Sequence, residues 1–198
     1  MLKLYNKLLK QYGKQGWWLL FNYKTEIFEY KSLIPKTQNQ KLEICLGAIL
    51  TQGTNWKNAE KALMNLIKNN LININKLDKI KENKLALLIK SSGYYRQKAR
   101  KIKEFVKFLK SNKKITRENL LSVWGIGKET ADSILLYAYN EPSFVIDNYT
   151  KKLFSNLNYC KKDISYDELQ RLITNKIPKN INVYKEFHSL IVAYGKNF

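Results

Sequence analysis

Residues 118–140 read ENLLSVWGIGKETADSILLYAYN, and this stretch decides the fold. A short apolar segment runs into the sequence WGIG at 124–127, and a second helix is expected to begin at about Lys128. Two glycines one residue apart let the backbone turn tightly and approach a ligand without interference from a Cβ atom. Free N–H groups at the start of the following helix attract phosphate. The pattern therefore predicts a phosphate-binding helix-hairpin-helix at about residues 117–139.

Individual residues of this turn have separate expected roles. Ile126, between the glycines, can pack between the two helices, and Lys128 adds a positive charge beside the backbone. In hairpins of this kind a monovalent cation bridges backbone carbonyls to the phosphate, which here indicates the carbonyls near Gly125 and Gly127. An ordinary corner between two helices would also explain a Gly-X-Gly sequence, but the flanking apolar helices, the lysine and the basic chain favour the hairpin.

The charge of the whole chain favours a polyanionic partner. Its 198 residues suit one domain or two small lobes, and 36 Lys and Arg against 16 Asp and Glu give a net charge of +20. Neutralising phosphates releases counterions and so favours nucleic-acid binding. Base composition is an alternative explanation, since Lys, Asn and Ile are abundant throughout, as an AT-rich genome would produce. A membrane surface would attract the same charge.

Other features of the sequence favour a cytoplasmic, nucleoid-associated protein without a membrane partner. No apolar run approaches the roughly 20 residues of a transmembrane helix, and no signal-peptide pattern opens the chain. The two cysteines, Cys45 and Cys160, lack metal-like spacing, which is typical of a reduced compartment. His188 is the only histidine, so a histidine-based zinc site is excluded, and so is a Ser-His-Asp triad unless His188 serves it; we expect a core or capping role.

Helical spacing dominates the apolar pattern. Apolar residues recur every three or four positions within 42–50, 62–67, 102–109 and 131–138. Strand-like alternation is nearly absent. The sequence therefore predicts an all-α chain in which these stripes form the core.

An aspartate follows the hairpin in the sequence and is a candidate catalytic carboxylate. Asp147 lies twenty residues after Gly127, directly behind the apolar residues Phe144-Val145-Ile146. It could simply cap the next helix by accepting a bond from a backbone N–H. Capping and catalysis are compatible, because a cap would fix the rotamer of the carboxylate and the apolar run would limit its access to solvent.

Together these residues resemble the endonuclease III / HhH-GPD superfamily of DNA glycosylases. The hairpin, the following Thr130-Ala131 and Asp147 match the central signature of that family. The stretches GAILTQGTNWKNAEKAL (47–63), SSGYYRQKARKI (91–102), YDELQ (166–170) and FHSLIVAYGK (187–196) extend the resemblance over most of the chain. Within the family the sequence is most similar to the bacterial 3-methyladenine DNA glycosylases.

The resemblance implies a two-lobed fold in which double-stranded DNA with a damaged base lies across the cleft between the lobes. A six-helix barrel would span residues 38–140 and carry the hairpin. The second lobe would combine residues 1–37 with residues 141–198. A monomer is the usual state in this family.

Three site roles follow from the resemblance. Gln52, in the turn Thr51-Gln52-Gly53-Thr54, would be the plug that fills the stack when the damaged nucleotide is flipped out, although a loop glutamine could instead make backbone bonds. Thr130 belongs to the DNA-binding hairpin. Asp147 would be the catalytic acid, which stabilises the oxocarbenium-like sugar and orients or deprotonates the attacking water.

The chain departs from bifunctional members of the family at one position. Those members carry a lysine that attacks the sugar, and Glu129 stands at that place, where a carboxylate cannot form a Schiff base. Lys128 is adjacent but rotated by about 100° around the helix, which aims it at phosphate. We expect a monofunctional, hydrolytic enzyme, with a lyase reaction from Lys128 as the lesser alternative.

We expect no iron–sulfur cluster and no other cofactor. Most endonuclease III relatives hold the cluster on four cysteines near the C-terminus, and this sequence ends at about the place where that loop would begin. Cys45 and Cys160 are too few and too far apart to ligate a cubane cluster.

The aromatic residues suggest the substrate. Adjacent tryptophans cannot both face one core, so at least one of Trp17 and Trp18 is expected to point into the cleft, with Trp56 after the plug turn. Aromatic faces attract the positive charge of an N-alkylated purine, which is also a good leaving group. The resemblance alone adds Lys196 to this base pocket, where it would sit awkwardly beside a cationic base.

Two other functions compete with this interpretation. The first is a glycosylase for another lesion, such as uracil or thymine opposite guanine or an oxidised base, with or without lyase activity. The second is a non-catalytic DNA-binding module that keeps the hairpin and has lost the chemistry.

Overall fold

The computed structural model describes residues 1–30 and 34–196, which form two units. The terminal unit combines Met1–Ile34 with Leu135–Phe198, and the central unit is Pro35–Ile134. The boundaries expected from the sequence lie after residues 37 and 140.

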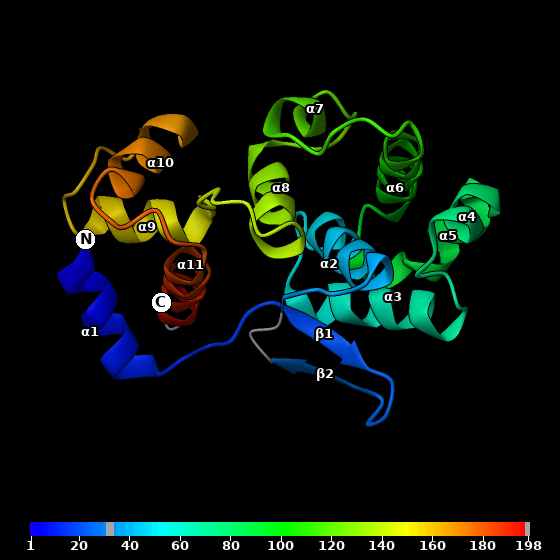
Figure 1. The fold of residues 1–198 in the computed structure, drawn as a ribbon, viewed down its shortest axis with the longest axis horizontal. Coiled ribbons are helices and arrows are strands. Elements are labelled where there is room, and N and C mark those ends of the chain that lie inside the picture. The colour runs from blue at the N-terminus through cyan, green and yellow to red at the C-terminus, as the bar shows by residue number, and fades with distance from the viewer. Residues whose placement is uncertain (31–33, 197–198) are drawn as a thin grey trace. The chain divides into compact units, whose positions relative to one another are not determined.

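The central unit is helical throughout. Its elements are α2 (Gln38–Leu50), α3 (Trp56–Lys68), α4 (Ile74–Lys79), α5 (Glu82–Leu88), the 3₁₀ helix η1 (Lys90–Ser92), α6 (Tyr95–Lys110), α7 (Arg117–Leu121) and α8 (Lys128–Ser133) (Figure 1). Side-chain caps start several of these helices, as at Thr37, which forms a capping box with Gln40. The predicted stripes are buried: Leu46, Ile49 and Leu50 are fully enclosed.

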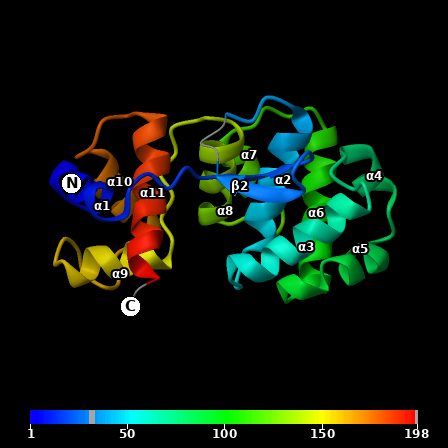
Figure 2. The same ribbon diagram turned by 90° about the horizontal axis from the view of Figure 1, so that it is seen from below.

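The terminal unit contains both ends of the chain. Its elements are α1 (Leu2–Tyr12), β1 (Leu19–Asn22), β2 (Ile27–Tyr30), one π-helical turn η2 (Ile134–Ala138) that continues from α8, α9 (Asn148–Asn156), α10 (Tyr166–Thr174) and α11 (Ile181–Gly195). Helix α11 packs against α1 and α9, which Figure 2 shows from a second direction. The aromatic core of the terminal unit includes Phe144, Phe154 and Phe187.

The mostly helical fold predicted from the sequence is confirmed, with one addition. β1 and β2 form an antiparallel hairpin with Leu19 opposite Tyr30, so the chain is not strictly all-α. The turn is held by side chains: Asn22 Nδ2 donates to Glu29 Oε1 (2.7 Å) and Thr25 Oγ1 donates to the same oxygen (2.8 Å). Strands of four residues are too short to produce a readable alternation.

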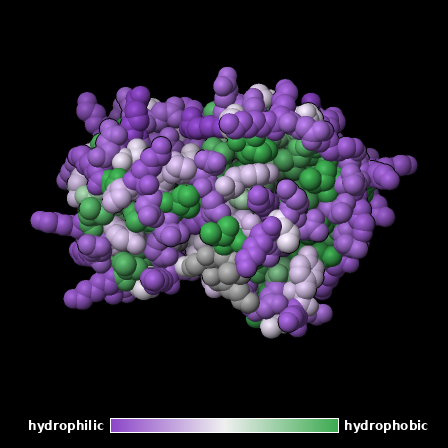
Figure 3. Space-filling view, viewed as in Figure 1, coloured by the Kyte–Doolittle hydropathy of each residue, from purple (hydrophilic) through white to green (hydrophobic). Residues whose placement is uncertain are grey.

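The surface is largely hydrophilic. On the face drawn in Figure 3, hydrophilic side chains cover most of the molecule and hydrophobic ones form separate patches. Within the described residues, no helix is both long and apolar enough to cross a membrane.

Candidate functional site

Asp147 is the N-cap of α9, and its position is fixed by two hydrogen bonds. Its Oδ1 atom accepts from the backbone N–H of Thr150 and from the Thr150 hydroxyl, each at 2.7 Å. The three residues before it, Phe144, Val145 and Ile146, are buried. The expected cap is therefore present, and it holds the carboxylate in one rotamer at the edge of an apolar core.

The second carboxylate oxygen of Asp147 faces the only histidine of the chain. Oδ2 lies 3.6 Å from Nε2 of His188 on α11, and the two side chains are 13% and 6% exposed. Burial pushes the pKa of the Asp147 carboxyl upward, but His188 and the bonds from Thr150 outweigh it and hold the pKa below its usual value. Asp147 is therefore ionised at neutral pH in spite of its burial.

Tyr137 on η2 completes the polar part of this arrangement. Its hydroxyl lies 2.7 Å from Nδ1 of His188 and 3.4 Å from the carbonyl oxygen of Lys185. Burial, together with the charges of Asp147 and Glu186, raises the pKa of the Tyr137 phenol well above its usual value. Tyr137 is thus a protonated phenol that fixes one nitrogen of the histidine ring.

Trp17 and Trp18, between α1 and β1, lie against the same residues. The Trp17 ring meets His188 edge to face, with centroids 5.7 Å apart, and the Trp18 ring lies 5.1 Å from Tyr137. Trp17 also approaches Tyr137, at 6.4 Å.

A near-perpendicular arrangement, with 79° between their planes, lets both half-buried rings lie against Tyr137. The expectation that at least one of them points into the cleft stays a prediction. We call the group of five residues the Asp147 cluster; its members are Asp147, His188, Tyr137, Trp17 and Trp18.

The predicted hairpin lies in the central unit and has the expected backbone. Gly125 has a φ of +84°, which favours glycine, and Ile126 is 5% exposed. Gly127 is the N-cap of α8, and nothing lies within 4 Å of where its Cβ atom would be. The open side of Gly127 is suited to close approach of a ligand.

Gln52 bonds to the hairpin in this structure. Its Nε2 donates to the carbonyl oxygen of Gly125 (3.2 Å) and to Oγ1 of Thr130 (2.8 Å), while Lys101 Nζ donates to its Oε1 (2.5 Å). These bonds match the alternative of a loop glutamine that braces the backbone. They also occupy one carbonyl of the expected cation site. The role of Gln52 as a plug stays a prediction.

The remaining predicted residues are distributed over both units. Trp56 opens α3 and is half-buried in the central unit, whereas Lys196 is exposed at the end of α11 in the terminal unit. Lys128 and Glu129 are exposed in the first turn of α8. Trp124, which directly precedes Gly125, was not expected as a site residue; Arg100 lies over its exposed ring, 4.3 Å from the ring centroid.

The residues present do not fit an iron–sulfur cluster. A cubane cluster needs four thiolates, and the chain has Cys45 in the central unit and Cys160 in the terminal unit. Burial raises the pKa of the Cys45 thiol, which opposes the thiolate form that a metal requires. Among the described residues there is also no group of three or more His, Cys, Asp and Glu side chains that could hold a metal ion.

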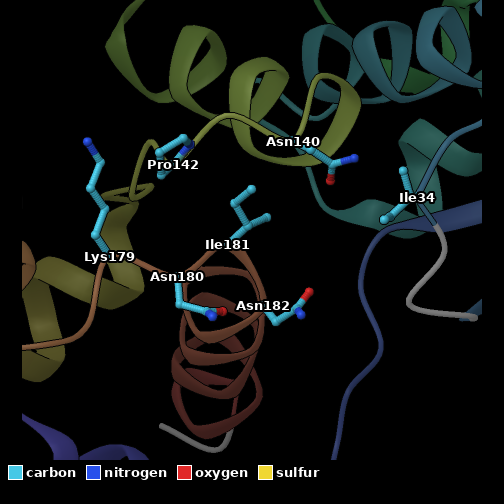
Figure 4. Close-up of a pocket in the computed structure, with 7 residues that line it drawn as sticks. All are labelled: Ile34, Asn140, Pro142, Lys179, Asn180, Ile181 and Asn182. Atoms are coloured by element: carbon cyan, nitrogen blue, oxygen red, sulfur yellow. The ribbon is translucent and has the colours of Figure 1, made fainter.

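A pocket of about 410 Å³ occurs elsewhere in the terminal unit. Figure 4 shows its lining, which is rich in amides: Ile34, Asn140, Pro142, Lys179, Asn180, Ile181 and Asn182. Asn180 caps α11 through a bond to the N–H of Val183. The lining shares no residue with the Asp147 cluster.

Comparison with known proteins gives a consistent result. The model of the "HhH-GPD superfamily base excision DNA repair protein" family matches residues 46–179. A protein of Methanocaldococcus jannaschii that carries the name of a DNA repair glycosylase is 39% identical over 209 residues, covering 99% of this chain and 87% of that protein.

Solved structures agree. The H. pylori 3-methyladenine DNA glycosylase bound to 1,N6-ethenoadenine is 30% identical with a TM-score of 0.76, covering 99% of this chain and 95% of that one. An endonuclease III in a DNA complex shares the fold at 18% identity, with a TM-score of 0.78 and coverage of 98% and 83%. The chain is therefore a member of the HhH-GPD superfamily of base excision DNA repair glycosylases.

Proposed function

We propose that this DNA glycosylase hydrolyses the N-glycosidic bond of N-alkylated purines of the 3-methyladenine type, with Asp147 as the catalytic carboxylate. The observation that carries the proposal is a largely buried, ionised carboxylate whose neighbours His188 and Tyr137 lie against two tryptophans. The Oδ1 atom of Asp147 is held by Thr150, and Trp17 and Trp18 gather on the residues that adjoin it.

This combination suits a damaged base that is positively charged and is already a good leaving group. An N-alkylated purine carries positive charge, which aromatic faces attract. Because such a base departs without being protonated, the enzyme mainly has to stabilise the positive sugar and supply water. One carboxylate, kept ionised by its hydrogen bonds, can perform both tasks. The similarity to a 3-methyladenine glycosylase over nearly the whole chain supports the same substrate class.

The proposed reaction is hydrolytic and leaves the strand intact. Glu129 occupies the position at which bifunctional relatives carry the attacking lysine, and a carboxylate cannot form a Schiff base with the sugar. Lys128 precedes it at the start of α8, where its charge favours phosphate.

Strand integrity after reaction with methylated duplex DNA tests this proposal. We expect breaks only after treatment with hot alkali, because base removal without lyase action leaves an alkali-labile abasic site. Breaks without alkali would mean that a lysine attacks the sugar. An absence of breaks under both conditions would refute the substrate class and direct the search to uracil and oxidised bases.

The variant Asp147→Asn tests the catalytic assignment. Asparagine keeps a capping oxygen, so α9 should still form, whereas the loss of negative charge should reduce turnover by about 100-fold or more, as for other electrostatic groups. DNA affinity should remain. Asp163→Asn, which changes an exposed aspartate of the same unit, is the matched control and should react at the normal rate. Full activity of Asp147→Asn would exclude the mechanism and leave a different carboxylate to be found.

A further inference from the structure

His188 is a buried polar residue among mainly apolar neighbours. It is 4% exposed on α11, between Phe187 and Ser189, and the ring of Trp17 covers it edge to face. Its Nε2 atom has no hydrogen-bond partner among the described residues. A buried ring nitrogen without a partner is unfavourable unless something compensates it. The nearest charged atom given for it is Oδ2 of Asp147, at 3.6 Å.

The hydroxyl of Tyr137, which bonds to Nδ1 of His188, influences which ring nitrogen carries the proton. Tyr137 is protonated and its hydroxyl lies 2.7 Å from Nδ1. If the imidazole is neutral, a proton on Nε2 faces the ionised Oδ2 of Asp147, whereas a lone pair at Nε2 would be repelled by it. The single ring proton is therefore on Nε2, and the phenol donates to Nδ1. If the imidazole is charged, Nδ1–H donates to Tyr137, whose hydroxyl can donate to the carbonyl oxygen of Lys185 at 3.4 Å. In both states Nε2 carries a proton and faces Asp147.

Among the groups around Asp147, His188 is the main electrostatic contact of its carboxylate. Oδ1 of Asp147 is taken by Thr150 from α9, and His188 from α11 faces Oδ2. From η2 the phenol of Tyr137 adjoins the histidine, and Glu186 adds negative charge near that phenol. Trp17 contributes an uncharged ring.

We propose that His188 is a positioning residue of the glycosylase: its Nε2–H orients the Oδ2 side of Asp147, and Tyr137 locks the ring in the tautomer that does so. This proposal rests on the assignment of Asp147 as the catalytic carboxylate. The consequence is a carboxylate that is hydrogen-bonded at Oδ1 by its own helix and faces the imidazole of α11 at Oδ2, 3.6 Å away. A small displacement of a reacting group can cost as much as about 100-fold in rate, so the second contact matters for turnover more than for stability.

Three variants separate positioning from packing. His188→Leu fills the site without a donor, and we expect single-turnover base release from methylated duplex DNA to slow by about 10- to 100-fold. DNA affinity should stay unchanged. His188→Gln supplies an amide N–H and should recover most of the lost rate. Tyr137→Phe keeps the ring but frees Nδ1, and should slow the reaction in the same direction by less.

The pH profile supplies a readout that packing alone would not change. With His188 removed, the influence that lowers the pKa of Asp147 is reduced while burial still raises it. The acid limb of the single-turnover rate should therefore move to higher pH in His188→Leu, and by less in His188→Gln. If His188→Leu keeps the normal rate and acid limb, the proposal is wrong. Equal losses in the leucine and glutamine variants with an unmoved acid limb would also overturn it.

The same assay distinguishes failure of this proposal from failure of the proposed function. If Asp147→Asn is inactive and His188→Leu is unaffected, only the positioning role of His188 is refuted. A fully active Asp147→Asn removes the catalytic assignment and the positioning role together. Should the leucine variant fail to fold, which circular dichroism reports, Tyr137→Phe decides the question, since it removes one hydroxyl from an otherwise preserved ring.

Discussion

The side chain of Lys101 fills the space beside Gly125 that a Cβ atom would occupy. A Cβ atom built there would collide with the aliphatic part of Lys101, and the φ of +84° is unfavourable for any other residue. Gly125→Ala should therefore destabilise the fold by at least about 1–2 kcal/mol, the cost of left-handed backbone for an L-residue. Thermal unfolding should show a melting temperature lower by several degrees.

Gly127 offers the matched control two residues away. It lacks a positive φ and has no atom within 4 Å of its ideal Cβ position. We expect Gly127→Ala to keep the normal melting temperature and to bind duplex DNA more weakly, because the added methyl group would keep phosphate away from the N–H groups of α8. A stable variant with unchanged DNA affinity would mean that phosphate does not approach this glycine.

Lys98 of α6 is buried and bonds to the last residues of two other helices, α2 and η1. Its Nζ donates to the carbonyl oxygens of Leu50 (2.8 Å) and Ser92 (2.6 Å), and the residue is 1% exposed. Lys98→Met should cost about 1–3 kcal/mol of unfolding free energy, because buried acceptors lose their donor. Lys107→Met, on the exposed face of the same helix, should change it by about 0.5 kcal/mol or less. Urea unfolding of both variants measures the contrast, and equal effects would contradict it.

The same lysine predicts a pH dependence of stability. Burial lowers the pKa of Lys98 from 10.5 to about 8. Between these values the unfolded chain binds more protons than the folded one, so the contribution of Lys98 to stability rises with pH. The difference in unfolding free energy between the normal chain and Lys98→Met should therefore be larger at pH 10 than at pH 7. A difference that shrinks with rising pH would contradict the direction of the shift.

The two interpretations of Gln52 can be separated by changing its partner. Thr130→Val removes the hydroxyl that accepts from Gln52 Nε2 but leaves the glutamine in place. If Gln52 is the plug, Gln52→Leu should slow base release from duplex DNA by about tenfold or more, since filling the stack offsets a few kcal/mol of unstacking. Thr130→Val should lose much less of the rate, because the amide of Gln52 remains available to fill the stack. On single-stranded substrate the effect of Gln52→Leu should disappear. Equal losses for both variants on both substrates would show that Gln52 only braces the hairpin.

Lys128 should contribute one phosphate contact. Lys128→Gln should lower DNA affinity for all sequences and reduce the slope of log affinity against log salt concentration by about 0.9. Lys68→Gln, an exposed lysine at the end of α3, keeps the net charge equal to that of the first variant. Fluorescence anisotropy at several salt concentrations gives both slopes, and identical slopes in the two variants would remove Lys128 from the interface.

The parts of the fold that could be predicted from the sequence depend on local patterns. The Gly-X-Gly turn requires a positive φ and an inward apolar residue, and Gly125 and Ile126 show both. The cap at Asp147 is equally local, since Thr150 is three residues away. Helices with buried apolar stripes follow from periodicity.

The rest of the Asp147 cluster could not be predicted because it depends on packing between distant segments. Tyr137 and His188 are 51 residues apart, and each lies within an apolar run whose pattern indicates core. The presence of a single histidine was the available signal, and its assignment to the core was correct for its burial but missed its contact with Asp147. The β hairpin was missed because its strands have only four residues each, LLFN and IFEY, and show no readable alternation.

The discontinuous construction of the terminal unit has a consequence for synthesis of the protein. Pro35–Ile134 is continuous, so the ribosome releases every residue of the central unit before α11 has been translated. Domains generally fold as units in the order of their release. Trp17 emerges from the ribosome early, but its contact with His188 can form only after α11 has been translated. The nascent chain can thus complete the glycine turn at 125–127 while the Asp147 cluster still lacks His188, so the candidate catalytic cluster is the later of the two to be assembled.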